Sequence, residues 1–177
     1  STQRSYAVAT SRSALAARSA LGDGSSFVLM ARLVVLVNGL PAAGKSTLAP
    51  GVATALALPL LSKDVIKETH AEVLGADPPI GLTQREWNRN LGAAASRTMW
   101  ALLAMSPPGA VLESSWRADV RGLVEAGLRH AGVGHVAEVW CEAPVPLLRD
   151  RFARRWASSH PIHGAAPDDD EWTRMIE

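Results

Sequence analysis

Short apolar runs alternate along the chain with longer segments in which apolar and polar residues mix at helical spacing. The clearest apolar run is LVVLV at residues 33–37, and it ends at Asn38-Gly39. A continuous run of leucine and β-branched side chains is typical of a strand that is buried on both faces, as in a parallel sheet. We therefore expect the folded domain to open with a buried strand over these residues.

Shorter apolar runs recur further along the chain. They predict strands at residues 60–61, 110–113 and 136–141. Helical spacing and prolines predict helices over residues 45–58, 64–74, 84–105 and 119–131, and from Pro144 or Pro146 to about 157. Thr83 and Glu86 have the spacing of a capping box at the start of the third of these helices. Strands that alternate with helices in this way predict an α/β fold with a parallel sheet.

Composition and charge narrow the class of protein. The chain has 177 residues, enough for one domain that buries its own core, and its 47% apolar content excludes a disordered chain. A net charge of +1 argues against a nucleic-acid binder with a broad basic surface, and no apolar run approaches the roughly 20 residues of a membrane span. Cys141 is the single cysteine, which excludes an intramolecular disulfide and a cysteine-rich zinc site and fits a reducing, cytoplasmic location.

Residues 1–30 differ from the rest of the chain in composition. They are rich in Ser, Ala and Arg, poor in acidic residues, and show no sustained apolar face. A transit peptide has such a composition. A disordered leader, a remnant of the expression vector or translated sequence upstream of a start at Met30 is the better interpretation. We assign the folded domain to residues 31–177.

The segment after the first strand matches the pattern G-x-x-x-x-G-K-[ST] at every fixed position, with a predicted strand before it and a predicted helix after it. Its glycines permit backbone conformations that a side chain would forbid, so the N–H groups of the loop can bind an anion at a helix N-terminus. The loop consists of Gly39, Leu40, Pro41, Ala42, Ala43, Gly44, Lys45, Ser46 and Thr47. It predicts binding of a nucleoside triphosphate.

The polar residues of this loop have predicted tasks. Lys45 would place a positive charge between the β- and γ-phosphates, and the Ser46 hydroxyl would ligate Mg²⁺. Thr47 would lie near the α-phosphate. These tasks indicate a nucleotide and a magnesium ion, but they name neither the reaction nor the acceptor.

Asp64 follows the second predicted strand. Ligands of open α/β sheets bind at the carboxyl ends of the strands, so Asp64 should face the same crevice as the phosphate loop. A phosphotransferase needs a carboxylate there to orient the acceptor hydroxyl and take its proton. The same position suits an N-cap of the next helix, and the two roles are compatible.

The residues around these motifs resemble a known group of enzymes. Residues 32–68, which include the phosphate loop and LLSKDVIKE, look like the opening of the small P-loop kinases described as AAA-type predicted kinases. AVLESSWR at 110–117, and LLRDRFARR with HPIH within 147–163, extend the resemblance. The group is similar to polynucleotide 5′-hydroxyl kinase domains, chloramphenicol phosphotransferase and the zeta toxins. The resemblance implies a three-layer α/β/α P-loop NTPase fold and a catalytic base at Asp64.

The resemblance also implies roles for residues after the third predicted strand. Glu113 would approach the magnesium ion or the acceptor, and Trp116 and Arg117 would line the acceptor pocket. On the residues alone, Glu113 could equally be a charge that favours the following helix, and Trp116 could be part of the core.

A lid is implied at about residues 147–165, where Arg151 and Arg155 have the R-x-x-x-R spacing that related kinases place over the triphosphate. Such arginines stabilise the charge that builds on the transferred phosphoryl group. A solvated basic helix face is the alternative. His160 and His163 have loose metal-ligand spacing but no Cys or third His nearby, so we assign them to the lid loop and not to a zinc site.

These residues together predict an ATP- and Mg²⁺-dependent kinase that phosphorylates a hydroxyl group of a small molecule. A polynucleotide 5′-hydroxyl kinase is one alternative, although the near-neutral charge speaks against it. An ATP-binding regulatory or toxin-type protein is another. Members of the group normally continue through a fifth strand and a last helix, which this chain, ending at Glu177, is expected to lack. The sequence does not name the acceptor, for which Trp87, Asn88 and Arg89 are further candidate contacts.

Overall fold

A computed structural model of the protein describes residues 32–156, 158–163 and 168–176. The expectations for residues 1–30 lie outside these ranges. The described chain forms a parallel sheet with the strand order β2-β3-β1-β4. Its strands are β1 (Leu33–Gly39), β2 (Leu60–Ser62), β3 (Gly109–Glu113) and β4 (Ala137–Cys141). Each predicted strand is present to within two residues of its expected bounds, and the α/β class is confirmed.

Helices connect the strands and continue beyond the last one. They are α2 (Lys45–Leu56), α3 (Lys63–Leu74), α4 (Gln84–Ala104), α5 (Arg121–His130), α6 (Val145–Trp156) and α7 (Asp169–Ile176), with 3-10 turns η1 (Ala118–Val120) and η2 (Pro161–His163). The capping box at the start of α4 is confirmed, because the Thr83 hydroxyl accepts from the Glu86 N–H while the Thr83 N–H donates to the Glu86 carboxylate. No helix within the described ranges is both long and apolar enough to cross a membrane.

Two helices depart from the sequence prediction by more than one residue at one end. α2 ends at Leu56, two residues early, because Leu58 precedes Pro59 and the residue before a proline is disfavoured in the helical conformation. Ala57 makes the exit in the left-handed region, with φ 52°. The helix predicted over 119–131 begins as the 3-10 turn η1 and continues as α5.

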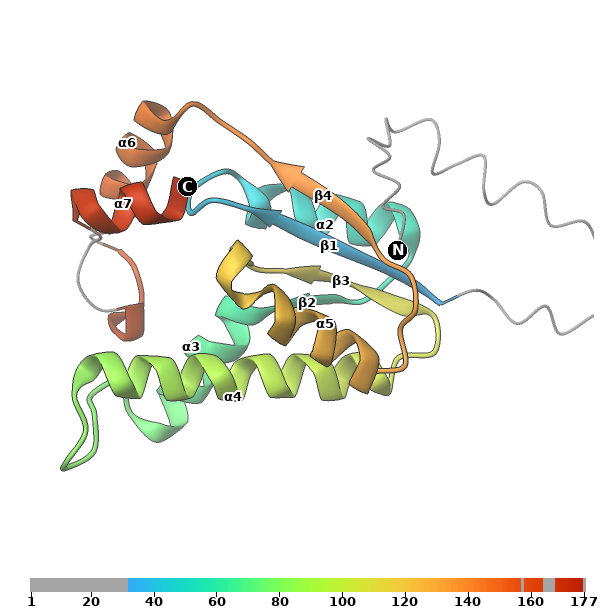
Figure 1. Cartoon of the computed structure of the whole chain (residues 1–177), viewed down its shortest axis with the longest axis horizontal. Coiled ribbons are helices and arrows are strands. Elements are labelled where there is room, and N and C mark those ends of the chain that lie inside the picture. Colours follow the sequence, from blue (N-terminus) through green and yellow to red (C-terminus); the bar gives the residue numbers. More distant parts are fainter. Residues whose placement is uncertain (1–31, 157, 164–167, 177) are drawn as a thin grey trace, which may run out of the picture.

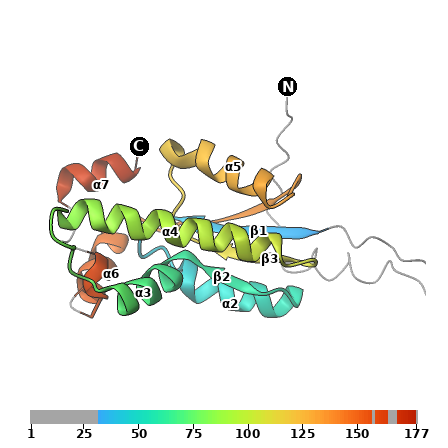
Figure 2. The same cartoon turned by 90° about the horizontal axis from the view of Figure 1, so that it is seen from below.

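The sheet lies between two layers of helices. One apolar core joins it to α4 and α5 and includes Leu36, Met99 and Leu128. A second core joins the opposite face to α2 and includes Val35 and Ala53. Figure 2 shows α2 and α5 on opposite sides of the strands. The sheet between helix layers confirms the expected three-layer fold, and β1, with buried residues facing both cores, is the strand buried on both faces that its sequence predicts.

The strands point in one direction, so their carboxyl ends form a single edge. Figure 1 shows α6 and α7 beyond this edge. The register sets Val37 beside Glu113 on one side and Val139 on the other, and Glu113 beside Ser62. The ends of the four strands therefore lie in one row, and the segments that leave them meet in one region.

Helix α5 approaches α4 closely at Gly127. A Cβ atom at this position would lie 2.3 Å from the nearest ring atom of Trp100, whose side chain is buried. Gly122 is on the same helix, and nothing lies within 4 Å of the Cβ position there. Packing thus requires glycine at position 127 and not at position 122.

The substitution Gly127→Ala is expected to lower the free energy of unfolding by about 1–3 kcal/mol, because the Trp100 indole must move to admit the methyl group. Gly122→Ala should raise the same free energy by up to about 1 kcal/mol, since alanine has the higher helix propensity. Urea unfolding followed by tryptophan fluorescence measures both. A Gly127→Ala protein as stable as Gly122→Ala would contradict the close contact between α4 and α5.

Candidate active site

The phosphate loop leads from β1 into α2 through backbone that favours glycine. Gly39 has φ 141°, and a Cβ atom there would lie 2.3 Å from the carbonyl oxygen of Cys141 on β4. Gly44 has φ 94° and immediately precedes α2. Both fixed glycines of the motif therefore have a physical reason in this fold. The loop ends at a helix N-terminus, where the first N–H groups have no intrahelical acceptors and can bind an anion.

The side chain of Lys45 lies against the backbone at the start of the phosphate loop. Its ammonium donates to the carbonyl oxygens of Gly39 at 3.1 Å and Leu40 at 2.9 Å, and its side chain is 6% exposed. Burial lowers the pKa of Lys45, while the nearby carboxylates of Glu113 and Asp64 oppose that shift. The loop thus carries a buried amine that faces two acidic groups.

Glu113 ends β3 and is the most deeply buried acidic residue among those described, at 2% exposure. Its Oε1 accepts from the Ser46 hydroxyl at 3.1 Å, and its Oε2 accepts from the Ser62 hydroxyl at 2.5 Å. The next helical turn begins only at Ala118, so a role as a charge at a helix start is wrong. Glu113 instead holds the hydroxyl that the motif assigns to magnesium.

Ser62 is a residue of the site that the sequence did not reveal. It ends β2, pairs with Glu113 in the sheet register and donates to it across 51 positions of sequence. Ser62 lies in the segment LLSKDVIKE that carries the resemblance, but the resemblance assigned no role to it. Its contribution follows only from the strand order, which places β2 next to β3.

Asp64 lies in the first turn of α3 with an exposed side chain. The helix begins one residue earlier than predicted, at Lys63, so the N-cap is Ser62 and the interpretation of Asp64 as the N-cap is wrong. β2 runs into α3 without a separate loop, which moves the helix start forward. Asp64 is therefore free of a capping role and lines a cavity with the phosphate loop.

The cavity that Asp64 lines is the larger of two beside the phosphate loop, and we call it the larger cavity. It has a volume of about 1180 Å³ and brings together most of the predicted site residues. Its walls include Pro41, Ala42 and residues 44–50 of the loop and α2, together with Asp64, Glu113, Arg151, Arg155, His160 and His163. The aromatic rings of Phe152 and Trp156, which stack with centroids 5.1 Å apart, add an apolar part to the α6 side of the cavity. The larger cavity thus has acidic, basic and apolar walls.

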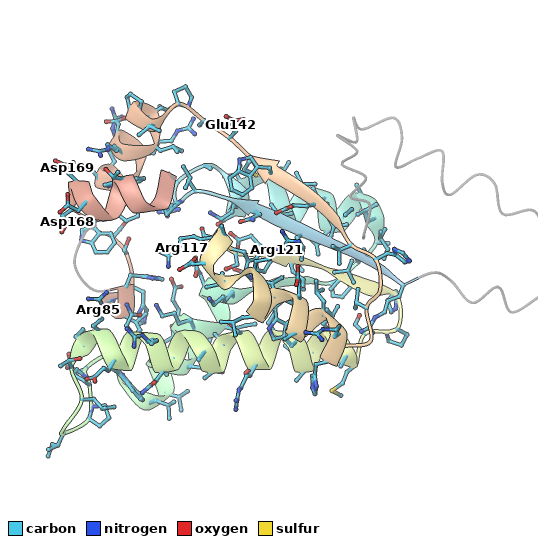
Figure 3. The ribbon with its side chains drawn as sticks, viewed as in Figure 1. Arg85, Arg117, Arg121, Glu142, Asp168 and Asp169 are labelled. Atoms are coloured by element: carbon cyan, nitrogen blue, oxygen red, sulfur yellow. The ribbon has the colours of Figure 1, made fainter. Side chains whose placement is uncertain are left out.

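The arginines of α6 divide into two groups. Arg151 and Arg155 line the larger cavity, whereas Arg154 pairs with Asp150 at 3.0 Å on the exposed side of the helix. Arg149 pairs with Asp169 of α7, which Figure 3 labels. The cavity-lining pair is the R-x-x-x-R pair predicted from the sequence.

The segment for which the resemblance implies a lid contacts α3. His163 of η2 lies 2.7 Å from Glu68 through its Nε2 and the Oε1 of the carboxylate. Ile162, beside it, is fully buried against Ala71 and Leu91. These contacts join the described part of this segment to the helix that carries Asp64.

Trp116 and Arg117 line a different, smaller cavity of about 320 Å³. Pro41 and Ser115 line both cavities, so the two spaces adjoin beside the phosphate loop. Of the further candidates, Trp87, Asn88 and Arg89 line neither cavity. The Trp87 indole N–H instead donates to the carbonyl of Gly75 at 3.0 Å, and its ring packs against the small core around Leu91.

Asn38 joins the phosphate loop to the segment after β3. Its Oδ1 accepts from the N–H groups of Gly39 at 2.8 Å and Trp116 at 2.9 Å. Its Nδ2 donates to the Trp116 carbonyl at 3.0 Å and to Glu138 of β4 at 2.9 Å. The side chain is 4% exposed, and both its oxygen and its nitrogen have hydrogen-bond partners within the protein. Asn38 is the second site residue that the sequence did not reveal.

Ser46 and Glu113 are the residues best suited to hold a magnesium ion. Their oxygens are hard donors, and Mg²⁺ in nucleotide sites is bound through one or two protein groups together with substrate phosphates. Within the described ranges, no group of three His, Cys, Asp or Glu side chains could enclose a metal. The donor set therefore fits a magnesium ion that arrives with a nucleotide.

Comparisons with known proteins agree with this fold and loop. The sequence model of the AAA domain family matches residues 34–176. No curated protein matches the chain. Among solved structures, a "putative kinase" from Chloroflexus aurantiacus J-10-fl is 29% identical over 82% of this chain and 78% of that chain, with a TM-score of 0.68.

Two further structures are less similar. The protein APE1195 is 25% identical over 73% of this chain and 70% of that chain, with a TM-score of 0.50. A sugar kinase from Janibacter sp. HTCC2649 is 17% identical over 81% of this chain and 90% of that chain, and its TM-score of 0.49 is too low to bear on function. Because the family match spans most of the chain, the protein belongs to the AAA domain family, with the fold and phosphate-binding loop of the small P-loop kinases.

Proposed function

We propose that this protein is a kinase that uses ATP and Mg²⁺ to phosphorylate a hydroxyl group of a small molecule. The observation that carries the proposal is the larger cavity, which the phosphate loop, Asp64 and two arginines line together. Its volume of about 1180 Å³ leaves room for more than one ligand, since a single drug-sized ligand occupies a pocket of roughly 300–1,000 Å³.

Asp64 is the group best suited to act as the base. Its exposed carboxylate can orient the acceptor hydroxyl and take its proton at a carboxylate oxygen. Glu113 is less suited, because it is buried and both of its oxygens already accept hydrogen bonds. Glu68 also lines the larger cavity, but its carboxylate is paired with His163. Asp64 and Glu113 are therefore assigned different roles, Asp64 toward the acceptor and Glu113 toward Ser46.

Positive groups surround the place where charge would build on the transferred phosphoryl group. Lys45 lines the larger cavity from the loop, and Arg151 and Arg155 line it from α6. Such charges act strongly where water is excluded, and preorganised electrostatics supply much of the rate in phosphoryl transfer. A bound Mg²⁺ would neutralise further phosphate charge, held by Ser46 and positioned by Glu113.

The substitution Asp64→Asn is expected to lower kcat at least about 100-fold, because the amide cannot take the proton. ATP affinity should stay within about threefold of the parent value, since the phosphate loop is unchanged. Coupled ADP release would be measured with a panel of hydroxyl compounds: sugars, aminoglycosides, chloramphenicol, nucleosides and a 5′-hydroxyl oligonucleotide.

Glu72→Gln is the matched control for this substitution, because Glu72 is exposed on the same helix and lines neither cavity. It should leave turnover unchanged. Near-normal turnover of Asp64→Asn would show that another group is the base. Intact ATP binding without stimulation by any acceptor would favour the regulatory alternative over a kinase.

The substitution Glu113→Gln should raise the Mg²⁺ concentration for half-maximal activity by about 10–100-fold, because it removes the negative charge that orients Ser46. Ser62→Ala should have a smaller effect, since it leaves the carboxylate and its bond to Ser46 in place. Activity titrated with Mg²⁺ at fixed ATP measures both. An unchanged magnesium requirement in Glu113→Gln would separate Glu113 from the metal.

A further inference from the structure

The smaller cavity has an unusual combination of walls. The charged residues that line it, Lys63 and Arg117, are both cations, and its lining also includes the two tryptophans Trp116 and Trp140. Trp140 is 53% exposed, which is high for so large an apolar side chain. Figure 3 shows Arg117 at the turn that leads into α5, beyond the carboxyl end of β3.

Among the residues that the structure describes, Lys63 has no hydrogen-bond or ion-pair partner that would explain its position. No hydrogen bond or ion pair within 4 Å joins its ammonium to another residue of the described chain, although the side chain is half-buried. Burial lowers the pKa of the Lys63 amine; the Asp64 carboxylate opposes this shift, and the Arg117 guanidinium adds to it. An anion in the cavity would relieve the effects of both burial and Arg117.

Arg117 has donors that its ion pair with Asp119 does not use. Its Nε and Nη2 donate to the two carboxylate oxygens of Asp119, at 3.2 and 2.7 Å. A guanidinium has five N–H donors, so those of Nη1 remain available. Asn38 fixes the backbone of the neighbouring Trp116 through both its N–H and its carbonyl group, which makes this wall a rigid one.

We propose that the acceptor carries an acidic group, a carboxylate or a phosphate, besides its hydroxyl, and that this group binds in the smaller cavity between Lys63 and Arg117. The apolar body of the acceptor would then lie against the indoles of Trp116 and Trp140. This inference rests on the proposed kinase function, because it assigns the smaller cavity to the acceptor of that reaction.

The positions of Lys63 and Asp64 make such an acceptor reasonable. They are consecutive residues in the first turn of α3, where successive side chains point about 100° apart. Lys63 accordingly lines the smaller cavity and Asp64 the larger one. Since Pro41 and Ser115 border both, one molecule can place its acid on Lys63 and its hydroxyl near Asp64.

Lysine acylation tests the anion site without any enzymatic activity. The chain has three lysines, Lys45, Lys63 and Lys67. The protein, with MgADP present, would be briefly acetylated with an N-hydroxysuccinimide ester, and each lysine followed by peptide mass spectrometry. D-Glucuronate and D-glucose 6-phosphate are the acidic probes, which separate carboxylate from phosphate, and D-glucose is the neutral probe. Lys67 is the internal control, because it lies one turn along α3, its pKa is also lowered by burial, and it lines neither cavity.

At least one acidic probe should slow acetylation of Lys63 about tenfold, because charge-assisted hydrogen bonds have this strength. D-Glucose should leave the rate at Lys63 unchanged, and Lys67 should react at the same rate with every probe. Equal rates at Lys63 with and without both acids, or equal protection by D-glucose, would overturn the proposal.

A kinetic arm connects the anion site to the reaction. Lys63→Met should raise KM for an acidic acceptor about tenfold or more and leave KM for its neutral counterpart unchanged, and Lys63→Arg should restore the acidic preference. If acceptors are turned over with no preference for the acid, and Lys63→Met does not change their KM, the anion-site inference is wrong and the kinase function is unaffected. If Lys63 is protected but no acceptor stimulates ADP release, the kinase function is wrong and the anion site is unaffected.

Discussion

The Glu113 carboxylate lies in the interior at the row where β1, β2 and β3 end. Burying a carboxylate costs several kcal/mol unless hydrogen bonds and an opposite charge compensate. The compensation comes from three directions: the Ser46 hydroxyl of the phosphate loop, the Ser62 hydroxyl of β2 and the nearby charge of Lys45. Each partner must keep its place for the burial to be tolerated, so this carboxylate fixes the loop relative to the sheet.

The parts that the sequence predicted are those whose signals are local. The phosphate loop is a contiguous motif, and the strand before it is a contiguous apolar run, so both could be placed to within two residues. The capping box of α4 needs only Thr83 and Glu86. Arg151 and Arg155 were selected because their R-x-x-x-R spacing resembles that of related kinases, and both arginines line the larger cavity.

The parts that the sequence missed depend on contacts between distant residues. Ser62 and Glu113 are 51 positions apart, and Asn38 and Trp116 are 78 apart. Neither serine nor asparagine at a strand end carries a pattern, and their importance appears only when the strand order is known. The division into two cavities also could not be predicted. The sequence placed Trp116 and Arg117 correctly at the carboxyl edge of the sheet, but it did not show which of the two cavities they would line.

A kinase must transfer a phosphoryl group and must also hold its acceptor in place. In the proposed reaction each of these tasks belongs to one of the two cavities that adjoin beside the phosphate loop. The groups suited to phosphoryl transfer, Lys45, Asp64 and the α6 arginines, lie on one side, and rigid aromatic and cationic walls lie on the other. α3 serves both sides, because the turn of the helix sends Lys63 and Asp64 in different directions from adjacent backbone positions. In the proposed reaction, an acceptor fixed at Lys63 has its hydroxyl held at a set distance from Asp64, and orientation of this kind lowers the barrier without any further catalytic group.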